Sequence, residues 1–134
     1  MLLLVAAAAA PPVALAGVKA GLVPTNNSLP LWYLLLAAPF WEEMLFRGGL
    51  QRWLLGFDWG ARHKAGLSAA NVLASCCFAL AHLPFQGWLA VAVLLPSLVL
   101  GLQLERGGRL LPCILLHAWF NLSWIMAARF WCNW

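Results

Sequence analysis

Residues 88–104 read WLAVAVLLPSLVLGLQL and contain no charged side chain. A run of this kind is typical of a helix that crosses a membrane, which needs roughly 20 mostly apolar residues. Four similar runs lie around it, at residues 1–18, 29–46, 67–83 and 110–132. The sequence therefore predicts an all-α protein: a polytopic transmembrane helical bundle of about five spanning helices, in a single domain over residues 1–134.

The composition excludes the main alternatives to a helical membrane protein. Hydrophobic residues make up 64% of the 134-residue chain and charged residues 9%, against roughly 45–50% and 25% in soluble domains. So little polar surface cannot cover a soluble globule, and so many apolar residues exclude intrinsic disorder. The apolar residues also come in long runs and do not alternate, as the strands of a membrane β-barrel would require.

Positive charges lie at the ends of the apolar runs, where they meet lipid headgroups. We therefore expect membrane lipid as a partner and no nucleic acid, although the net charge is +4. If every run spans, the face that holds the amino terminus also carries Arg47, Arg52, Arg62, Lys64, Arg106 and Arg109. The opposite face carries Lys19 and Arg129. The positive-inside rule then places the amino terminus in the cytoplasm.

The first run has a second interpretation, because an Ala-Leu-Ala sequence ending at Ala16 resembles a signal-peptidase site. No Lys or Arg precedes the apolar stretch, and two prolines interrupt it. These features favour a retained helix over a cleaved signal. Cleavage would leave four helices and would not remove the polar residues described next.

Two glutamates and an arginine lie at the end of the second run, although a charge in the membrane costs roughly 2.5–3.5 kcal/mol on insertion scales. Glu43 and Arg47 are four residues apart, so they share a helix face and can pair. Glu42 points roughly 100° away and has no evident local partner. A carboxylate of this kind in a dry cavity can act as a general acid or base. The alternative is that both glutamates are ordinary interfacial charges.

Two histidines and an asparagine complete the polar set, with Asn71 and Gln103 as minor members. His82, at the end of the third run, fits either a catalytic or an interfacial position. His117 and Asn121, one turn apart in the fifth run, fit either an oxyanion cradle or a hydrogen bond between packed helices. If the helices bring the set together, it supplies a base, a water-orienting partner and an oxyanion site, as acyl-bond hydrolysis requires.

Helix geometry constrains this convergence. If the second helix continues to about Gly56, Glu42 lies roughly 20 Å from its cytoplasmic end, and His82 lies roughly 25 Å along the third helix. His117 lies only about 10 Å from the cytoplasmic end of the fifth helix. We therefore expect a tilted helix, or a last connection that dips into the bilayer.

Three motifs occur in the order Glu42-Glu43-x-x-x-Arg47, Phe78-x-x-x-His82 and His117-x-x-x-Asn121. Their order, spacing and flanking residues resemble the signature of the CAAX-protease and bacteriocin-processing (CPBP, or Abi) family of glutamic-type intramembrane proteases. The resemblance covers about residues 32–125. Because the chain is similar to the compact bacterial members, we expect it in a bacterial inner (cytoplasmic) membrane.

The resemblance implies an endopeptidase that hydrolyses a peptide bond of a membrane-associated protein or peptide. Glu42 would be the general base and His82 its partner in holding the attacking water. His117 and Asn121 would stabilise the oxyanion, and Glu43 and Arg47 would form the supporting pair that orients the first motif. Some compact members are thought to process a C-terminal sorting signal, which is one candidate substrate here. No prenyl-binding feature is evident, so prenylated substrates are not inferred.

The sequence leaves three alternatives open. Family members have been described as metalloproteases, and His and carboxylate ligands suit zinc. The chain has no HExxH motif and no CxxC pair, so we expect a reaction without a cofactor, with a zinc-dependent protease as the alternative. A non-catalytic membrane partner, such as a bacteriocin-immunity or assembly factor, could keep the same residues for binding. A small transporter or channel subunit has thinner support.

Overall fold

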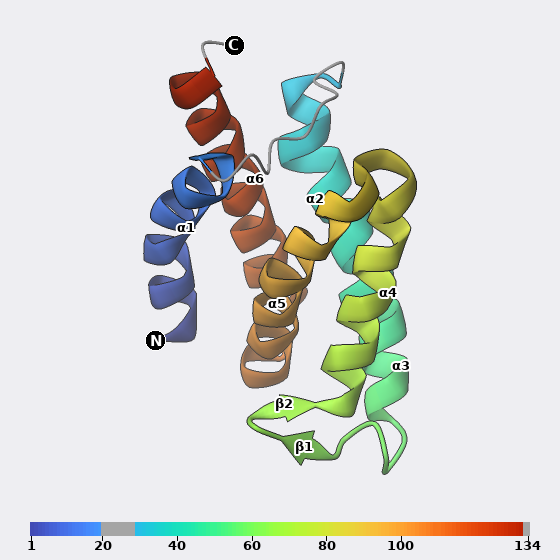
Figure 1. Cartoon of the computed structure of the whole chain (residues 1–134). Helices are drawn as coiled ribbons and strands as arrows, with labels where there is room; N and C mark the ends of the chain where they lie inside the picture. The colour runs from blue at the N-terminus through green and yellow to red at the C-terminus, as the bar shows by residue number, and fades with distance from the viewer. Residues whose placement is uncertain (20–28, 133–134) are drawn as a thin grey trace.

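The computed structural model describes residues 1–19 and 29–132, and most of these residues are helical (Figure 1). The all-α prediction is therefore confirmed. Helix α1 spans Leu2–Lys19, α4 spans Ala69–Gln86, α5 spans Leu94–Gly107 and α6 spans Leu110–Cys132. The bounds of α1 and α6 closely match the first and fifth predicted runs.

A long, irregular helix carries the first motif. Its segments follow one another directly: η1 (Tyr33–Ala37, π-helical), α2 (Ala38–Glu43), η2 (Met44–Gln51, π-helical) and α3 (Arg52–Leu55). Wide π-helical turns are rare and occur frequently at functional sites. The apolar run ends at Phe46, whereas the helix continues to Leu55, close to the end at Gly56 that the depth estimate assumes. The helix continues because Arg47 and Gln51 are buried inside the bundle, where α5 supplies their partners.

A small antiparallel hairpin, β1 (His63–Lys64) with β2 (Leu67–Ser68), connects α3 to α4. The two residues of its turn, Ala65 and Gly66, have positive φ angles of 52° and 82°, which is the pattern of a type I′ turn. Ser68 then caps α4, because its hydroxyl accepts a hydrogen bond from the backbone N–H of Asn71 at 2.9 Å. The hairpin thus fixes where α4 begins.

Helices α4 and α5 fold back on each other through a 3-10 segment, η3 (Gly87–Val93). The third predicted run ends at Leu83, whereas α4 continues through Pro84 to Gln86. A proline has no backbone N–H, so α4 lacks one backbone hydrogen bond in its last turn. The helix stops at Gly87, whose φ of 58° suits a residue without a side chain.

Three stretches of the described residues are long and apolar enough to cross a membrane: Leu2–Lys19, Ala69–Gly107 and Leu110–Phe130. The second of these contains both α4 and α5. The amino terminus, the β1–β2 hairpin and the end of α5 lie at one end of the bundle, whereas η3 and the carboxyl end of α6 lie at the other (Figure 1). This alternation is the one that the five runs predict. Arg47, however, is buried and does not belong to the cationic face.

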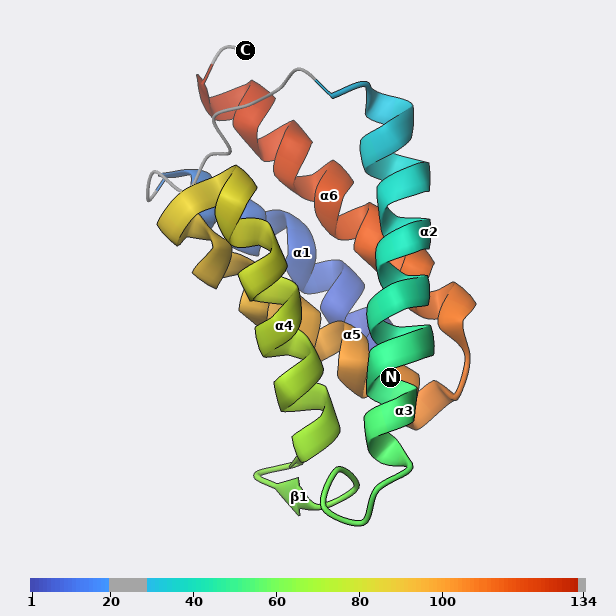
Figure 2. The same ribbon diagram turned by 90° about the vertical axis from the view of Figure 1, so that its right-hand side faces the viewer.

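Small side chains bring α1 and α6 close together. Ala14 and Val18 of α1 pack against Ala127 and Ala128 of α6, as is common between membrane helices. Helix α6 is inclined relative to α2 and α4 (Figure 2). This inclination lets α6 carry His117 to the first motif.

Candidate active site

Glu42 and Glu43, at the end of α2, occupy different environments. The side chain of Glu43 is completely buried, whereas that of Glu42 is 29% exposed. The two side chains point in different directions because consecutive helical residues are rotated by about 100°. Glu43 therefore faces the interior of the bundle, and Glu42 has access to its surface.

Glu43 joins the first motif to the third. One of its carboxylate oxygens, Oε2, lies 3.3 Å from Nε of Arg47, and both side chains are fully buried. The other, Oε1, lies 2.9 Å from Nδ1 of His117 on α6. The predicted Glu43–Arg47 pair is therefore present, and its contact with His117 is one that the sequence did not predict.

His82 and His117 are each held through Nδ1. In His82 this nitrogen lies 2.8 Å from the backbone carbonyl of Phe78, and in His117 it faces Glu43. A carbonyl and an ionised carboxylate can only accept, so Nδ1 carries the hydrogen in both rings. In a neutral imidazole the second nitrogen, Nε2, is then an acceptor.

Both Nε2 atoms face Glu42. The Oε2 atom of Glu42 lies 3.6 Å from Nε2 of His117 and 3.9 Å from Nε2 of His82. Helices α2, α4 and α6 thus bring three acceptor atoms to one place, which requires a hydrogen donor among them. A water molecule meets this requirement, because it can donate to the carboxylate and to one imidazole at the same time.

Asn121 is the predicted site residue with the least contact to the others. Its side-chain Nδ2 donates to the backbone carbonyl of Leu34 at 2.8 Å, which ties α6 to the η1 turn. It lies one turn beyond His117 on α6, so it flanks the site. Its contact with Leu34 is the helix–helix hydrogen bond that the sequence left open as an alternative. The second amide hydrogen of Nδ2 is not used in that bond.

Phe78 forms the apolar wall of the site. Its ring lies 4.4 Å from the His82 ring and 5.9 Å from the His117 ring, measured between centroids. Arg47 lies 5.6 Å from the centre of the same ring. The motif spacing places Phe78 one turn before His82, and the structure shows that it contacts all three motifs.

A ladder of buried polar contacts behind the site was missed in the sequence. Arg47 donates to the hydroxyl of Ser97 on α5, and Gln51 donates to the backbone carbonyl of Gly101 at 3.2 Å and to Glu105 at 2.8 Å. Gln51 follows Arg47 by four residues, as Arg47 follows Glu43, so the helical period carried a signal for it. Ser97 carried none, because a single serine in an apolar run is unremarkable.

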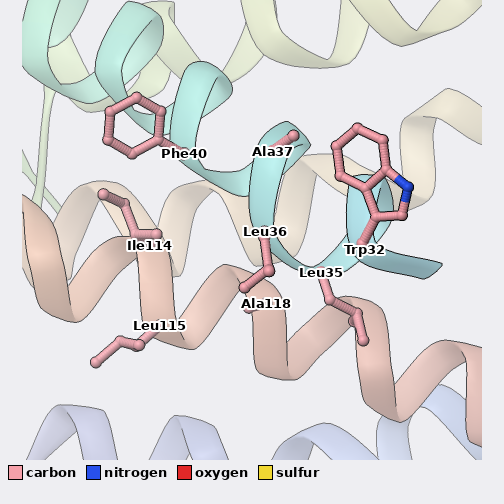
Figure 3. Close-up of a pocket in the computed structure, with 8 residues that line it drawn as sticks. All are labelled: Trp32, Leu35, Leu36, Ala37, Phe40, Ile114, Leu115 and Ala118. Atoms are coloured by element: carbon pink, nitrogen blue, oxygen red, sulfur yellow. The ribbon is translucent and has the colours of Figure 1, made fainter. Parts of the chain in front are cut away.

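An apolar groove of about 460 Å³ lies beside the polar site, between the first-motif helix and α6 (Figure 3). Its lining residues are Trp32, Leu35, Leu36, Ala37 and Phe40 on one side, and Ile114, Leu115 and Ala118 on the other. The same two helices carry Glu42 and His117.

Within the described part of the chain, no group of three or more His, Cys, Asp or Glu residues is arranged to hold a metal ion. Cys76, Cys77 and Cys113 are free thiols.

Residues 24–123 match the family of type II CAAX prenyl endopeptidases, Rce1-like. The chain belongs to this family. The match includes all three motifs, so the resemblance inferred from their order and spacing is confirmed. The Rce1-like chain is thus a CAAX-type intramembrane peptidase and an integral membrane protein. Comparisons with curated proteins and with solved structures give no match.

Proposed function

We propose that this Rce1-like chain hydrolyses a peptide bond of a membrane-associated protein or peptide through a water molecule that Glu42 activates. One observation carries the proposal: two imidazole nitrogens lie 3.6 and 3.9 Å from the same oxygen of Glu42. A base and its partners must lie within reach of a shared water molecule before proton transfer can occur. These distances leave each pair within reach of one bridging water.

The proposed reaction begins when Glu42 takes a proton from water while the water oxygen attacks the scissile carbonyl carbon. Nε2 of His82 accepts a hydrogen bond from the second O–H group of the water and so orients the attack. The tetrahedral intermediate collapses when Glu42 returns its proton to the leaving amine and the C–N bond breaks. The products are an amine and a carboxylic acid, which then loses the second water-derived proton to solvent, and no covalent acyl-enzyme forms.

The proposed oxyanion site uses His117 and Asn121. Glu43 holds Nδ1 of His117 at 2.9 Å, so the imidazole presents Nε2 to the reacting atoms, and a donor role toward the oxyanion requires a hydrogen on Nε2. Asn121 offers the amide hydrogen that Leu34 does not use. Donors that face the developing negative charge lower the barrier of acyl transfer.

The proposed substrate is a protein or peptide with an apolar segment near the scissile bond, and a C-terminal sorting signal is one example. The apolar groove between the first-motif helix and α6 supports this class, because its lining suits a hydrocarbon side chain and the same two helices carry Glu42 and His117. The proposed location is a bacterial inner membrane with the amino terminus in the cytoplasm. The excess of Lys and Arg on the amino-terminal face supports that orientation.

Purified protein in liposomes tests the proposal. The probe is a panel of quenched fluorogenic peptides with apolar C-terminal segments, including a prenylated CAAX peptide because the family name refers to that substrate. We expect cleavage of at least one peptide by the wild type and by Asp58→Asn, a matched control on an exposed carboxylate. Glu42→Gln should cleave none of them. Cleavage that persists in Glu42→Gln, or no cleavage by the wild type, would overturn the proposed activity.

The alternative function, a non-catalytic membrane partner, predicts a different result. A binding role depends on the shape and polarity of the site, which Glu42→Gln largely preserves. Glu42→Gln would then retain the cellular phenotype of the wild type at equal accumulation. The peptidase proposal predicts that the phenotype disappears.

A further inference from the structure

Helix α5 carries none of the three motifs, yet one of its side chains contacts the first motif directly. Nη2 of Arg47 donates to the Oγ atom of Ser97 at 2.6 Å and to the backbone carbonyl of Ser97 at 2.9 Å. Arg47 and Ser97 are both completely buried. Helix α5 thus holds the arginine of the first motif through two hydrogen bonds to one residue.

These two bonds define how the guanidinium group of Arg47 is oriented. Its Nε lies 3.3 Å from Oε2 of Glu43, an ion pair without hydrogen-bond geometry. Neither Nε nor Nη1 has a hydrogen-bond partner among the described residues. Ser97 and Glu43 therefore fix the guanidinium group together: Ser97 sets its orientation through two hydrogen bonds, and Glu43 attracts its charge.

The contacts continue from Arg47 into the site. Glu43 shares its two carboxylate oxygens between Arg47 and Nδ1 of His117. Nε2 of His117 faces Glu42 at 3.6 Å. A shift of the guanidinium group moves the carboxylate of Glu43, and hence changes the orientation of the imidazole that this carboxylate holds.

We propose that Ser97 is a positioning residue of the active site, which acts on His117 through Arg47 and Glu43. This inference rests on the proposed peptidase function for its kinetic consequence. Gln51 supports the arrangement one turn further along, because its Nε2 donates to the backbone carbonyl of Gly101, four residues after Ser97. This second rung of the ladder fixes the register of α5 against the first-motif helix.

A purely structural role for Ser97 is the competing explanation, and Ser75 provides a matched control. Ser75 is also a completely buried serine. Its hydroxyl donates to Oδ1 of Asn71 at 3.1 Å, and therefore to an uncharged group outside the three motifs. Ser75→Ala therefore removes a hydroxyl from an equally buried serine and leaves the contacts of Arg47 in place.

The first test is kinetic and uses the wild type, Ser97→Ala, Ser97→Thr and Ser75→Ala with the peptide panel in proteoliposomes. We expect kcat to fall about 10- to 100-fold in Ser97→Ala, the range for loss of a hydrogen bond to a charged group, with KM unchanged. Ser97→Thr keeps a hydroxyl and should recover part of this loss. Ser75→Ala should stay within about 2-fold of the wild type, as a loss outside the motifs does not reach the transition state.

The second test does not depend on turnover. The chain has three histidines, so nitrogen-15 labelling of histidine gives a simple NMR spectrum in detergent micelles. We expect the ring nitrogen signals of His117 to shift in Ser97→Ala and to stay in place in Ser75→Ala. Unchanged His117 signals in Ser97→Ala would overturn the inference, as would an equal loss of kcat in both alanine variants.

The two proposals fail in different ways. If Glu42→Gln cleaves the panel as well as the wild type, the proposed function is wrong, and the NMR comparison still decides the role of Ser97. If Glu42→Gln is inactive and Ser97→Ala is as active as the wild type, the peptidase proposal stands and the positioning role is wrong.

Discussion

Replacement of Arg47 by methionine tests the buried charge network most sharply. The substitution keeps an unbranched side chain, which is shorter than arginine and apolar, and removes the positive charge beside Glu43. Two unit charges 3.3 Å apart attract each other by about 5 kcal/mol at an effective dielectric constant of about 20. Removal of one partner from a buried pair typically destabilises a protein by about 3–5 kcal/mol.

The structure places the expected loss near the lower end of that range. Glu43 keeps His117 as a partner at 2.9 Å, so its charge is not left without compensation. We therefore expect Arg47→Met to lower the free energy of unfolding by about 3 kcal/mol. Glu43→Gln should have a similar effect, because it leaves Arg47 buried without its carboxylate.

The double variant Glu43→Gln/Arg47→Met measures the interaction itself. A neutral pair in the same space needs no opposite charge, so the double variant should lose less than the sum of the single losses, by about 2 kcal/mol. Reversible unfolding in mixed micelles of mild detergent and dodecyl sulfate gives the three free energies. Strictly additive losses, or single variants within about 1 kcal/mol of the wild type, would show that Glu43 and Arg47 do not stabilise each other.

Three further predictions concern packing, the third motif and the cofactor. Gly101→Ala should destabilise the bundle by about 1–3 kcal/mol in the same unfolding assay, because the new methyl group overlaps the Asn71 side chain. Gly49→Ala is the control: its methyl group meets only ordinary contacts, so this variant should not be destabilised. Asn121→Ala should cost about 1 kcal/mol of stability, because the hydrogen bond to Leu34 is lost, and should also lower kcat. A loss of stability without a change in kcat would show that Asn121 only packs α6 against η1. Activity on the peptide panel should survive dialysis against a chelator. If the chelator abolished activity and added zinc restored it, the zinc-dependent alternative would be favoured.

The sequence predicted those parts of the fold that follow from composition and helical period. Apolar runs located α1 and α6 closely, and the spacing of four residues placed Glu43 with Arg47 and separated Glu42 from both. The ends of the middle helices were less predictable. Whether a helix continues through Pro84 or past Phe46 depends on tertiary partners, which one sequence does not display.

Contacts between helices were the part that sequence reasoning did not reach. The motifs predicted that His117 belongs to the site, but not that Glu43 holds its Nδ1 atom. The hydrogen bonds from Arg47 to Ser97 join residues 50 positions apart, and a single buried serine gives no periodic signal. The inclination of α6, which brings His117 to the depth of Glu42, is set by packing against α1 and α5 and not by any local pattern.

The central claim is that Glu42 activates the water that cuts the peptide bond. The most direct measurement is the rate of peptide hydrolysis by Glu42→Gln in proteoliposomes, beside the wild type and Asp58→Asn at equal amounts of folded protein. The account predicts a fall of at least about 100-fold for Glu42→Gln, since general-base catalysis contributes roughly 100- to 10,000-fold, and no change for Asp58→Asn. Hydrolysis by Glu42→Gln within a few-fold of the wild-type rate would contradict it.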